Sequence, residues 1–201
     1  MSEGTRLTAE LRRRAVGAVM EGMTQTAVAA AYGVNRKTAS RWVSKFREGG
    51  GNSNDYLSGR NGADVVVGDE GNDRLRGGRG RDILIGGRGR DDIRGGSGDD
   101  LLIDGFTSFD TNLEALNAIS TEWNSGASYQ TRINNLQTGV GPDLVALKTT
   151  GPDATVFDDE ERDTLKGDRG RDWFLGDNDV DRIRDKRRYE VFTDIDLLDL
   201  I

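Results

Sequence analysis

The chain of 201 residues contains no histidine and no cysteine. Their absence excludes a Ser-His-Asp or Cys-His catalytic site and excludes zinc or haem ligation by these side chains. No apolar run approaches the roughly 18 residues that span a bilayer, and residues 1–14 do not resemble a Sec-type signal. Oxygen remains as the metal ligand, from 35 Asp and Glu side chains and from glycine carbonyls. Oxygen ligands favour hard cations, calcium before magnesium.

Hydrophobic residues are also scarce, at 34%, whereas glycine occurs 28 times. This composition argues against one large core and favours a repeat architecture that uses apolar residues sparingly and regularly. Charge is divided unevenly, because residues 1–48 carry nine Lys and Arg against four Asp and Glu, whereas residues 49–201 carry nineteen against thirty-one. A basic head of +5 on an acidic body of −12 indicates two modules with different partners.

From Gly50 the sequence divides into units of nine residues: GGNSNDYLS, GRNGADVVV, GDEGNDRLR, GGRGRDILI, GGRGRDDIR and GGSGDDLLI. The first position is glycine in all six units, and the eighth is always aliphatic. The sixth is always aspartate: Asp55, Asp64, Asp73, Asp82, Asp91 and Asp100. Glycines permit a sharp turn that exposes carbonyls, and the last three residues form a short strand whose eighth side chain points inward while its neighbours point out.

These units resemble the hemolysin-type (RTX) repeat G-G-x-G-x-D-x-U-x, which implies a calcium-filled parallel β-roll. The resemblance further implies two repeats in each turn of the roll and a Ca²⁺ ion between loops two repeats apart. Asp55, Asp73 and Asp91 would then line one side, and Asp64, Asp82 and Asp100 the other, giving four complete sites. The glycines implied at the metal-binding turns are Gly77, Gly78, Gly80, Gly86, Gly87, Gly89, Gly95, Gly96 and Gly98.

Two other interpretations of the repeats are a flexible glycine-rich linker and a β-solenoid that needs no metal. A linker would not keep aspartate and an aliphatic residue at fixed positions, and a metal-free solenoid would place more apolar residues in each rung. The units also depart from the pattern, since Ser53 replaces the fourth-position glycine and Arg60 and Asp69 replace the second. Four arginines occupy variable loop positions: Arg79, Arg81, Arg88 and Arg90. Their positive charge close to the carboxylates would lower calcium affinity unless the side chains point to solvent, so the sequence does not fix the affinity.

The repeat is interrupted after residue 103. We expect a helix capped near Asp110, a second helix from Ser128 to Gly139, and short strands at 144–148 and 154–158. Together they predict a packing insert or cap over the roll. The repeat then resumes as DDEERDTLK, GDRGRDWFL and GDNDVDRIR, which makes Asp172 a metal-ligand candidate, with Asp163 and Asp181 as further options.

Three helices are expected in the basic head, with Gly33 in the turn between the second and third. The segment TQTAVAAAYGVNRKTASRWVSKFREGG resembles the helix-turn-helix of insertion-sequence transposases and integrases. The resemblance places Arg36, Lys37, Ser40 and Arg41 on the face that enters the major groove, and Lys45 suits phosphate contact. Nothing resembles the RNase H-like domain of a transposase, so transposition is not predicted. The alternative is a three-helix cap with solvated charges.

The fold class expected is α+β and multidomain. Its predicted parts are a helix-turn-helix bundle (1–48), a parallel β-roll (49–103), a helical insert or cap (104–157), and degenerate repeats with a tail (158–201). Three functions remain open: a non-enzymatic calcium-binding module with calcium as folding cofactor, a calcium-responsive DNA-binding protein, and an enzyme that carries repeats as a secretion aid. Calcium and duplex DNA are the expected partners. Repeats of this kind favour secretion and a helix-turn-helix favours the cytoplasm, so the compartment stays open.

Overall fold

The computed structural model describes residues 46–47 and 52–195. The chain divides into two compact units, Met1–Glu48 and Gly49–Ile201. In the first unit the described residues form a short strand, β1 (Phe46–Arg47). The helix-turn-helix bundle expected within residues 1–48 lies outside the described residues.

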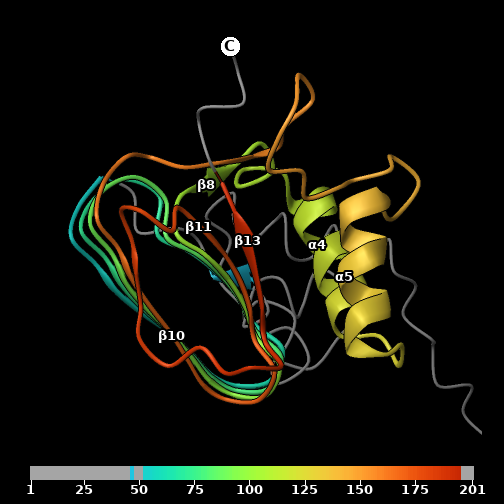
Figure 1. Ribbon diagram of the computed structural model, residues 1–201, viewed down its shortest axis with the longest axis horizontal. Helices are drawn as coiled ribbons and strands as arrows, with labels where there is room; N and C mark the ends of the chain where they lie inside the picture. Colours follow the sequence, from blue (N-terminus) through green and yellow to red (C-terminus); the bar gives the residue numbers. More distant parts are fainter. Residues whose placement is uncertain (1–45, 48–51, 196–201) are drawn as a thin grey trace, which may run out of the picture. The chain divides into compact units, whose positions relative to one another are not determined.

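The second unit contains two facing sheets of short parallel strands, in the arrangement of a β-roll (Figure 1). Sheet 1 has the order β2 (Tyr56–Asn61), β4 (Arg74–Arg79), β6 (Asp92–Ser97), β10 (Thr164–Arg169) and β12 (Arg182–Ile183). Sheet 2 contains β3 (Val65–Val67), β5 (Ile83–Ile85), β7 (Leu101–Ile103), β11 (Trp173–Gly176) and β13 (Val191–Asp194). Successive repeats alternate between the sheets, so two repeats make one turn.

Strand register follows the repeat. Leu57 pairs with Leu75 in sheet 1 and Val66 with Leu84 in sheet 2. The same register crosses the insert, because Ile93 pairs with Leu165, and β7 pairs with β11 in the same way. The roll therefore continues as if residues 104–157 were absent, and the resumed repeats stack directly on the first array.

The eighth-position side chains form the core between the two sheets, as the sequence predicts. Seven of them are completely buried: Val66, Leu75, Leu84, Ile93, Leu102, Leu165 and Phe174. Leu57, Ile183 and Phe192 pack against this cluster and are partly buried. One apolar column thus runs through the whole roll.

Alternation along each strand places the neighbours of the eighth position on the outer side of the roll, and in sheet 2 this side is also buried. There the seventh and ninth positions are apolar and buried: Val65, Val67, Ile83, Ile85, Leu101, Ile103, Trp173 and Leu175. In sheet 1 the equivalent positions are polar, for example Arg74 and Arg76, which are exposed. The two sheets therefore differ in the side chains at these two positions.

The insert begins and ends at a small antiparallel ribbon between β8 (Phe106–Thr107) and β9 (Val156–Phe157). It contains two helices, α4 (Leu113–Trp123) and α5 (Tyr129–Thr138), which lie side by side next to sheet 2 (Figure 1). The second helix is capped by Ser128 and ends at Gly139, as predicted.

Two local expectations for the insert are wrong. The amino cap of α4 is Asn112, whose side chain accepts from two backbone N–H groups of the first turn, whereas Asp110 accepts from the backbone and hydroxyl of Thr107. Residues 144–148 form no strand and make only an isolated bridge, Val140 to Val145. Lys148 instead accepts the N–H groups of residues 155 and 156 across the TTGPD loop. Among the described residues, no helix is long and apolar enough to cross a membrane.

Candidate metal-binding turns

The repeat aspartates lie in two columns, one at each edge of the roll. The Asp73 column contains Asp55, Asp73, Asp91, Asp163 and Asp181, and the Asp82 column contains Asp64, Asp82, Asp100 and Asp172. Within a column the Oδ1 atom of every aspartate after the first accepts the backbone N–H of the aspartate one turn before it. The distance is 2.9 Å from Asp64 N to Asp82 Oδ1 and 2.8 Å from Asp100 N to Asp172 Oδ1. One oxygen of each carboxylate therefore holds the stack together.

The second oxygen of these carboxylates, Oδ2, differs from Oδ1 in its hydrogen bonding. Within the described part of the chain, the buried Oδ2 atom has no hydrogen-bond donor in six repeats: Asp73, Asp82, Asp91, Asp100, Asp163 and Asp172. A buried, unpaired carboxylate oxygen is costly. Its repetition in six repeats indicates a ligand that supplies positive charge.

Burial raises the pKa of these carboxyl groups, because it disfavours the charged form and neighbouring carboxylates repel it. The pKa rises to about 7 for Asp82, Asp91 and Asp172 and to about 9 for Asp100 and Asp163. Burial is the largest cause in every case, opposed by the hydrogen bond from the preceding backbone N–H. A bound cation would restore the ionised form.

First-position glycines bring backbone close to these free oxygens. A Cβ on Gly77 would stand 2.5 Å from Asp82 Oδ2 and 2.6 Å from the carbonyl oxygen of Gly95. Gly95 bears the same relation to Asp100, at 2.5 Å. Only glycine fits here, because a side chain would collide with these oxygens. The absence of a side chain lets the free carboxylate oxygen and the carbonyl oxygen of the following turn lie close together beside the glycine. Such an all-oxygen donor set fits calcium.

The second and fourth positions require glycine for another reason, a left-handed backbone. The φ angles are positive at all six candidate glycines of these positions: Gly78 (118°), Gly87 (106°), Gly96 (114°), Gly80 (135°), Gly89 (112°) and Gly98 (133°). Arg60, Asp69 and Asp168 adopt the same conformation at the second position, with φ of 77°, 69° and 70°. The roll thus imposes the turn even where the sequence departs from glycine, at a cost in backbone strain.

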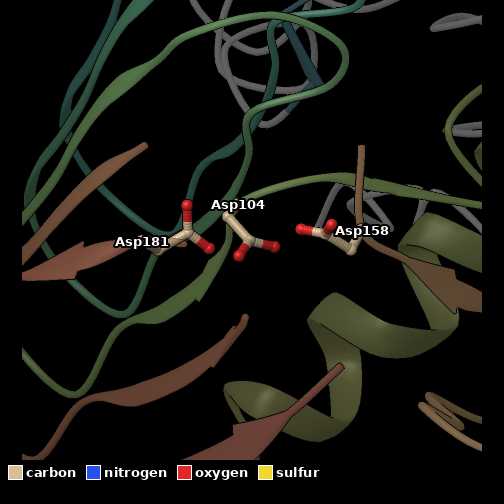
Figure 2. Close-up of side chains that lie close together, drawn as sticks. All are labelled: Asp104, Asp158 and Asp181. Atoms are coloured by element: carbon tan, nitrogen blue, oxygen red, sulfur yellow. The ribbon is translucent and has the colours of Figure 1, made fainter. Parts of the chain in front are cut away.

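A further acidic cluster lies where the insert leaves and rejoins the roll (Figure 2). Carboxylate oxygens of Asp104, Asp158 and Asp181 lie within 4.8 Å of one another. Burial and the contact with Asp181 raise the pKa of Asp104 well above its usual value. Asp104 Oδ2 accepts the N–H of Asp177, at 3.0 Å. Sequence reasoning missed Asp104 and Asp158, since neither occupies the sixth position of a repeat.

The roll also contains a tenth repeat, which was not expected from the sequence. Residues 185–193, DKRRYEVFT, place Glu190 at the sixth position and Phe192 at the eighth. β13 pairs in register with β11, and Phe192 lies opposite Phe174. Glu190 is buried at the end of the Asp82 column, and burial raises its pKa. The acidic sixth position and the apolar eighth position could have indicated this repeat from the sequence. The repeat was hard to recognise because the unit contains no glycine.

The insert is attached to the turns of the Asp82 column. Tyr129 Oη donates to the carbonyl oxygen of Asp172, at 2.7 Å, and accepts the N–H of Val191, at 3.1 Å. Arg132 is completely buried and donates to Asp99, at 2.6 Å. Burial would raise the pKa of Asp99, but hydrogen bonds from Arg132 and Arg171 outweigh it and lower the pKa. The insert therefore holds the turn that precedes Asp100.

The DNA-contact candidates Arg36, Lys37, Ser40, Arg41 and Lys45 lie outside the described residues. The assignment of these residues to a helix-turn-helix is supported by comparison with protein families. The same comparison supports the assignment of the repeats. A family described as a helix-turn-helix domain matches residues 11–52. The RTX calcium-binding nonapeptide repeat matches residues 50–75, 67–102 and 155–184. Both resemblances seen in the sequence are thereby confirmed. No curated protein and no solved structure matches the chain significantly.

Proposed function

We propose that the stacked turns bind Ca²⁺ ions and that calcium is a structural folding cofactor of the roll. The observation that carries this proposal is the unpaired, buried Oδ2 atom repeated at successive turns. The match to calcium-binding repeats over three segments supports the same cation. Calcium supplies positive charge to a donor set made only of oxygen.

Each ion would be held between aspartates one turn apart in a column. In the Asp82 column the pairs are Asp64 with Asp82, Asp82 with Asp100, and Asp100 with Asp172. In the Asp73 column they are Asp55 with Asp73, Asp73 with Asp91, Asp91 with Asp163, and Asp163 with Asp181. Gly77, Gly86 and Gly95 leave the space beside these oxygens. An interior aspartate belongs to two pairs, whereas Asp55 belongs to one.

Calcium binding and folding would be coupled, because the stack brings buried carboxylates within one turn of each other. Without a cation, these groups must either repel or take up protons. A preformed site does not exist in the unfolded chain, so the free energy of binding becomes free energy of folding.

The test is calorimetric calcium titration of the full chain, with circular dichroism in calcium and in chelator. Asp82→Asn should remove more bound calcium than Asp55→Asn, its matched control, because Asp82 serves two pairs and Asp55 one. Magnesium at the same concentration should restore less structure, since it keeps its water shell. An unchanged spectrum and melting temperature in chelator would favour a metal-free solenoid instead.

A second function is proposed for the head, on the helix-turn-helix match to residues 11–52. We propose that it binds duplex DNA, with Arg36, Lys37, Ser40 and Arg41 toward bases and Lys45 toward phosphate. Arg41→Ala in the full chain should reduce discrimination between DNA sequences, whereas Lys45→Ala should weaken binding to all of them alike. A gel-shift titration measures both. Equal effects of the two variants on all sequences would contradict these roles.

We further propose that the chain acts as a binding protein and not as an enzyme. Both matched modules are generally non-enzymatic, and the repeat aspartates are already occupied in holding the turns. An enzyme that carries the repeats as a secretion aid would need a further catalytic constellation, for which no described feature argues.

A further inference from the structure

The outer face of sheet 1 carries a concentration of positive charge. At the seventh and ninth positions, on either side of the buried column, six basic side chains point away from the core: Arg74, Arg76, Arg94, Lys166, Arg182 and Arg184. The parallel register aligns Arg76 with Arg94 and Arg94 with Lys166. Strands about 4.8 Å apart therefore produce a regular row of cations along the roll. We call this surface the basic face.

The fold does not require this charge. In sheet 2 the same positions are occupied by apolar residues such as Ile83 and Leu101. The body from residue 49 onward has a net charge of −12. The basic side chains of this face thus contrast with the net charge of the module that carries them.

Part of the basic charge is neutralised within the face. Asp92 lies between Arg74 and Arg94, with Nε to carboxylate distances of 3.4 and 3.2 Å, and Lys166 contacts Asp168. Within residues 52–195 the other three arginines of the face, Arg76, Arg182 and Arg184, form no ion pair. These three side chains are exposed and can bind an external anion.

A groove of about 580 Å³ lies over this face. Arg74, Arg94 and Arg184 line it, and the lining also includes Asp92 of the face and the turn residues Asp55, Asp73 and Asp91. With calcium in those turns, as proposed above, the aspartates no longer repel an anion. The groove then presents arginines beside neutralised turns.

We propose that the basic face binds the phosphate backbone of duplex nucleic acid, as a second contact surface in addition to the helix-turn-helix. This inference rests on the proposed function, both for calcium in the turns and for DNA as partner. Arginine forks match phosphate oxygens in geometry, and a row of cations suits a polymer with regularly spaced anions. The helix-turn-helix match in the same chain favours nucleic acid over other polyanions.

The experiment measures binding of the full chain to a mixed-sequence DNA duplex by fluorescence anisotropy, in calcium, over a range of salt. The face variant Arg76→Ser/Arg182→Ser/Arg184→Ser should lose about 0.9 from the salt slope for each phosphate contact removed. Its control is Arg79→Ser/Arg169→Ser/Arg188→Ser, which removes the same charge from exposed residues that lie outside the seventh and ninth positions of the basic face. The control should keep nearly the full slope.

Two further measurements separate this inference from the proposals on which it rests. Arg41→Ala should retain the part of the salt slope that the face variant loses, and calorimetry should show unchanged calcium binding in the face variant. Equal slopes for the face variant and its control, with calcium bound, would overturn the inference while leaving the calcium proposal intact. Binding of heparin but not of duplex DNA would also overturn it, in favour of an acidic polysaccharide.

Discussion

At the scale of single residues, each interior repeat aspartate has a double task. One oxygen accepts a backbone N–H from the preceding turn, as in the 2.9 Å bond from Asp82 N to Asp100 Oδ1, and the other remains available for a cation. An aspartate in this position therefore has two effects. Its bonded oxygen stabilises the stack, and its unpaired buried oxygen favours binding of a metal cation. The requirement for glycine beside it follows from the same contact, because a Cβ on Gly95 would stand 2.5 Å from Asp100 Oδ2.

The strained second position of the repeat gives a prediction at this scale. Arg60 has φ of 77°, a conformation that costs an L-residue about 1 kcal/mol or more. Arg60→Gly should relieve this strain and raise the free energy of unfolding by about 1 kcal/mol, less the entropy glycine gains on unfolding. Chemical denaturation in calcium measures it. Asn61→Gly is the control, because Asn61 has no positive φ, and it should lower stability; an equal loss in both variants would contradict the strain.

At the scale of elements, the sequence predicts what local chemistry determines. Ser128 and Gly139 specify both ends of α5, and the spacing of Leu116, Ile119 and Trp123 specifies the buried side of α4. The cap of α4 was misplaced because Asp110 bonds to Thr107, a competition between two acceptors that spacing does not reveal. The contact of Tyr129 with Asp172 joins residues far apart in sequence, and no local pattern predicts it.

That contact gives a prediction about the insert. Tyr129→Phe removes a buried hydroxyl that bonds both Asp172 and Val191, which leaves backbone groups unpaired and should lower the free energy of unfolding by about 1–3 kcal/mol. Tyr56→Phe is the control, because Tyr56 is 59% exposed. Denaturant unfolding in calcium measures both variants. An unchanged stability in Tyr129→Phe would mean that the insert contributes little to holding the last turns.

At the scale of the whole second unit, the periodicity of the sequence predicts the inward eighth position, and the resemblance to RTX repeats implies the roll and the two aspartate columns. The periodicity did not reveal that sheet 2 is apolar on both faces, although the contrast between ILI and RLR was visible in alternate repeats. Continuity across the insert also needed the structure, since only pairing of Ile93 with Leu165 shows that the roll resumes in register. The extra apolar burial of sheet 2 supplies stability beyond one aliphatic residue for each repeat.

The raised carboxyl pKa values predict how the whole roll responds to pH without calcium. Burial raises the pKa from 3.8 to about 7 for Asp82 and to about 9 for Asp100. Between the unfolded and folded pKa values the folded state holds more protons, so the stability of the calcium-free chain falls as pH rises from about 4 to about 9. Bound calcium requires the ionised carboxylates, so its stabilising effect grows over the same range. Thermal unfolding followed by circular dichroism at pH 5 and pH 8 should therefore show the larger calcium-induced rise in Tm at pH 8, and in chelator the higher Tm at pH 5. The reverse order in chelator would mean that these carboxylates are not buried as charges in the calcium-free roll.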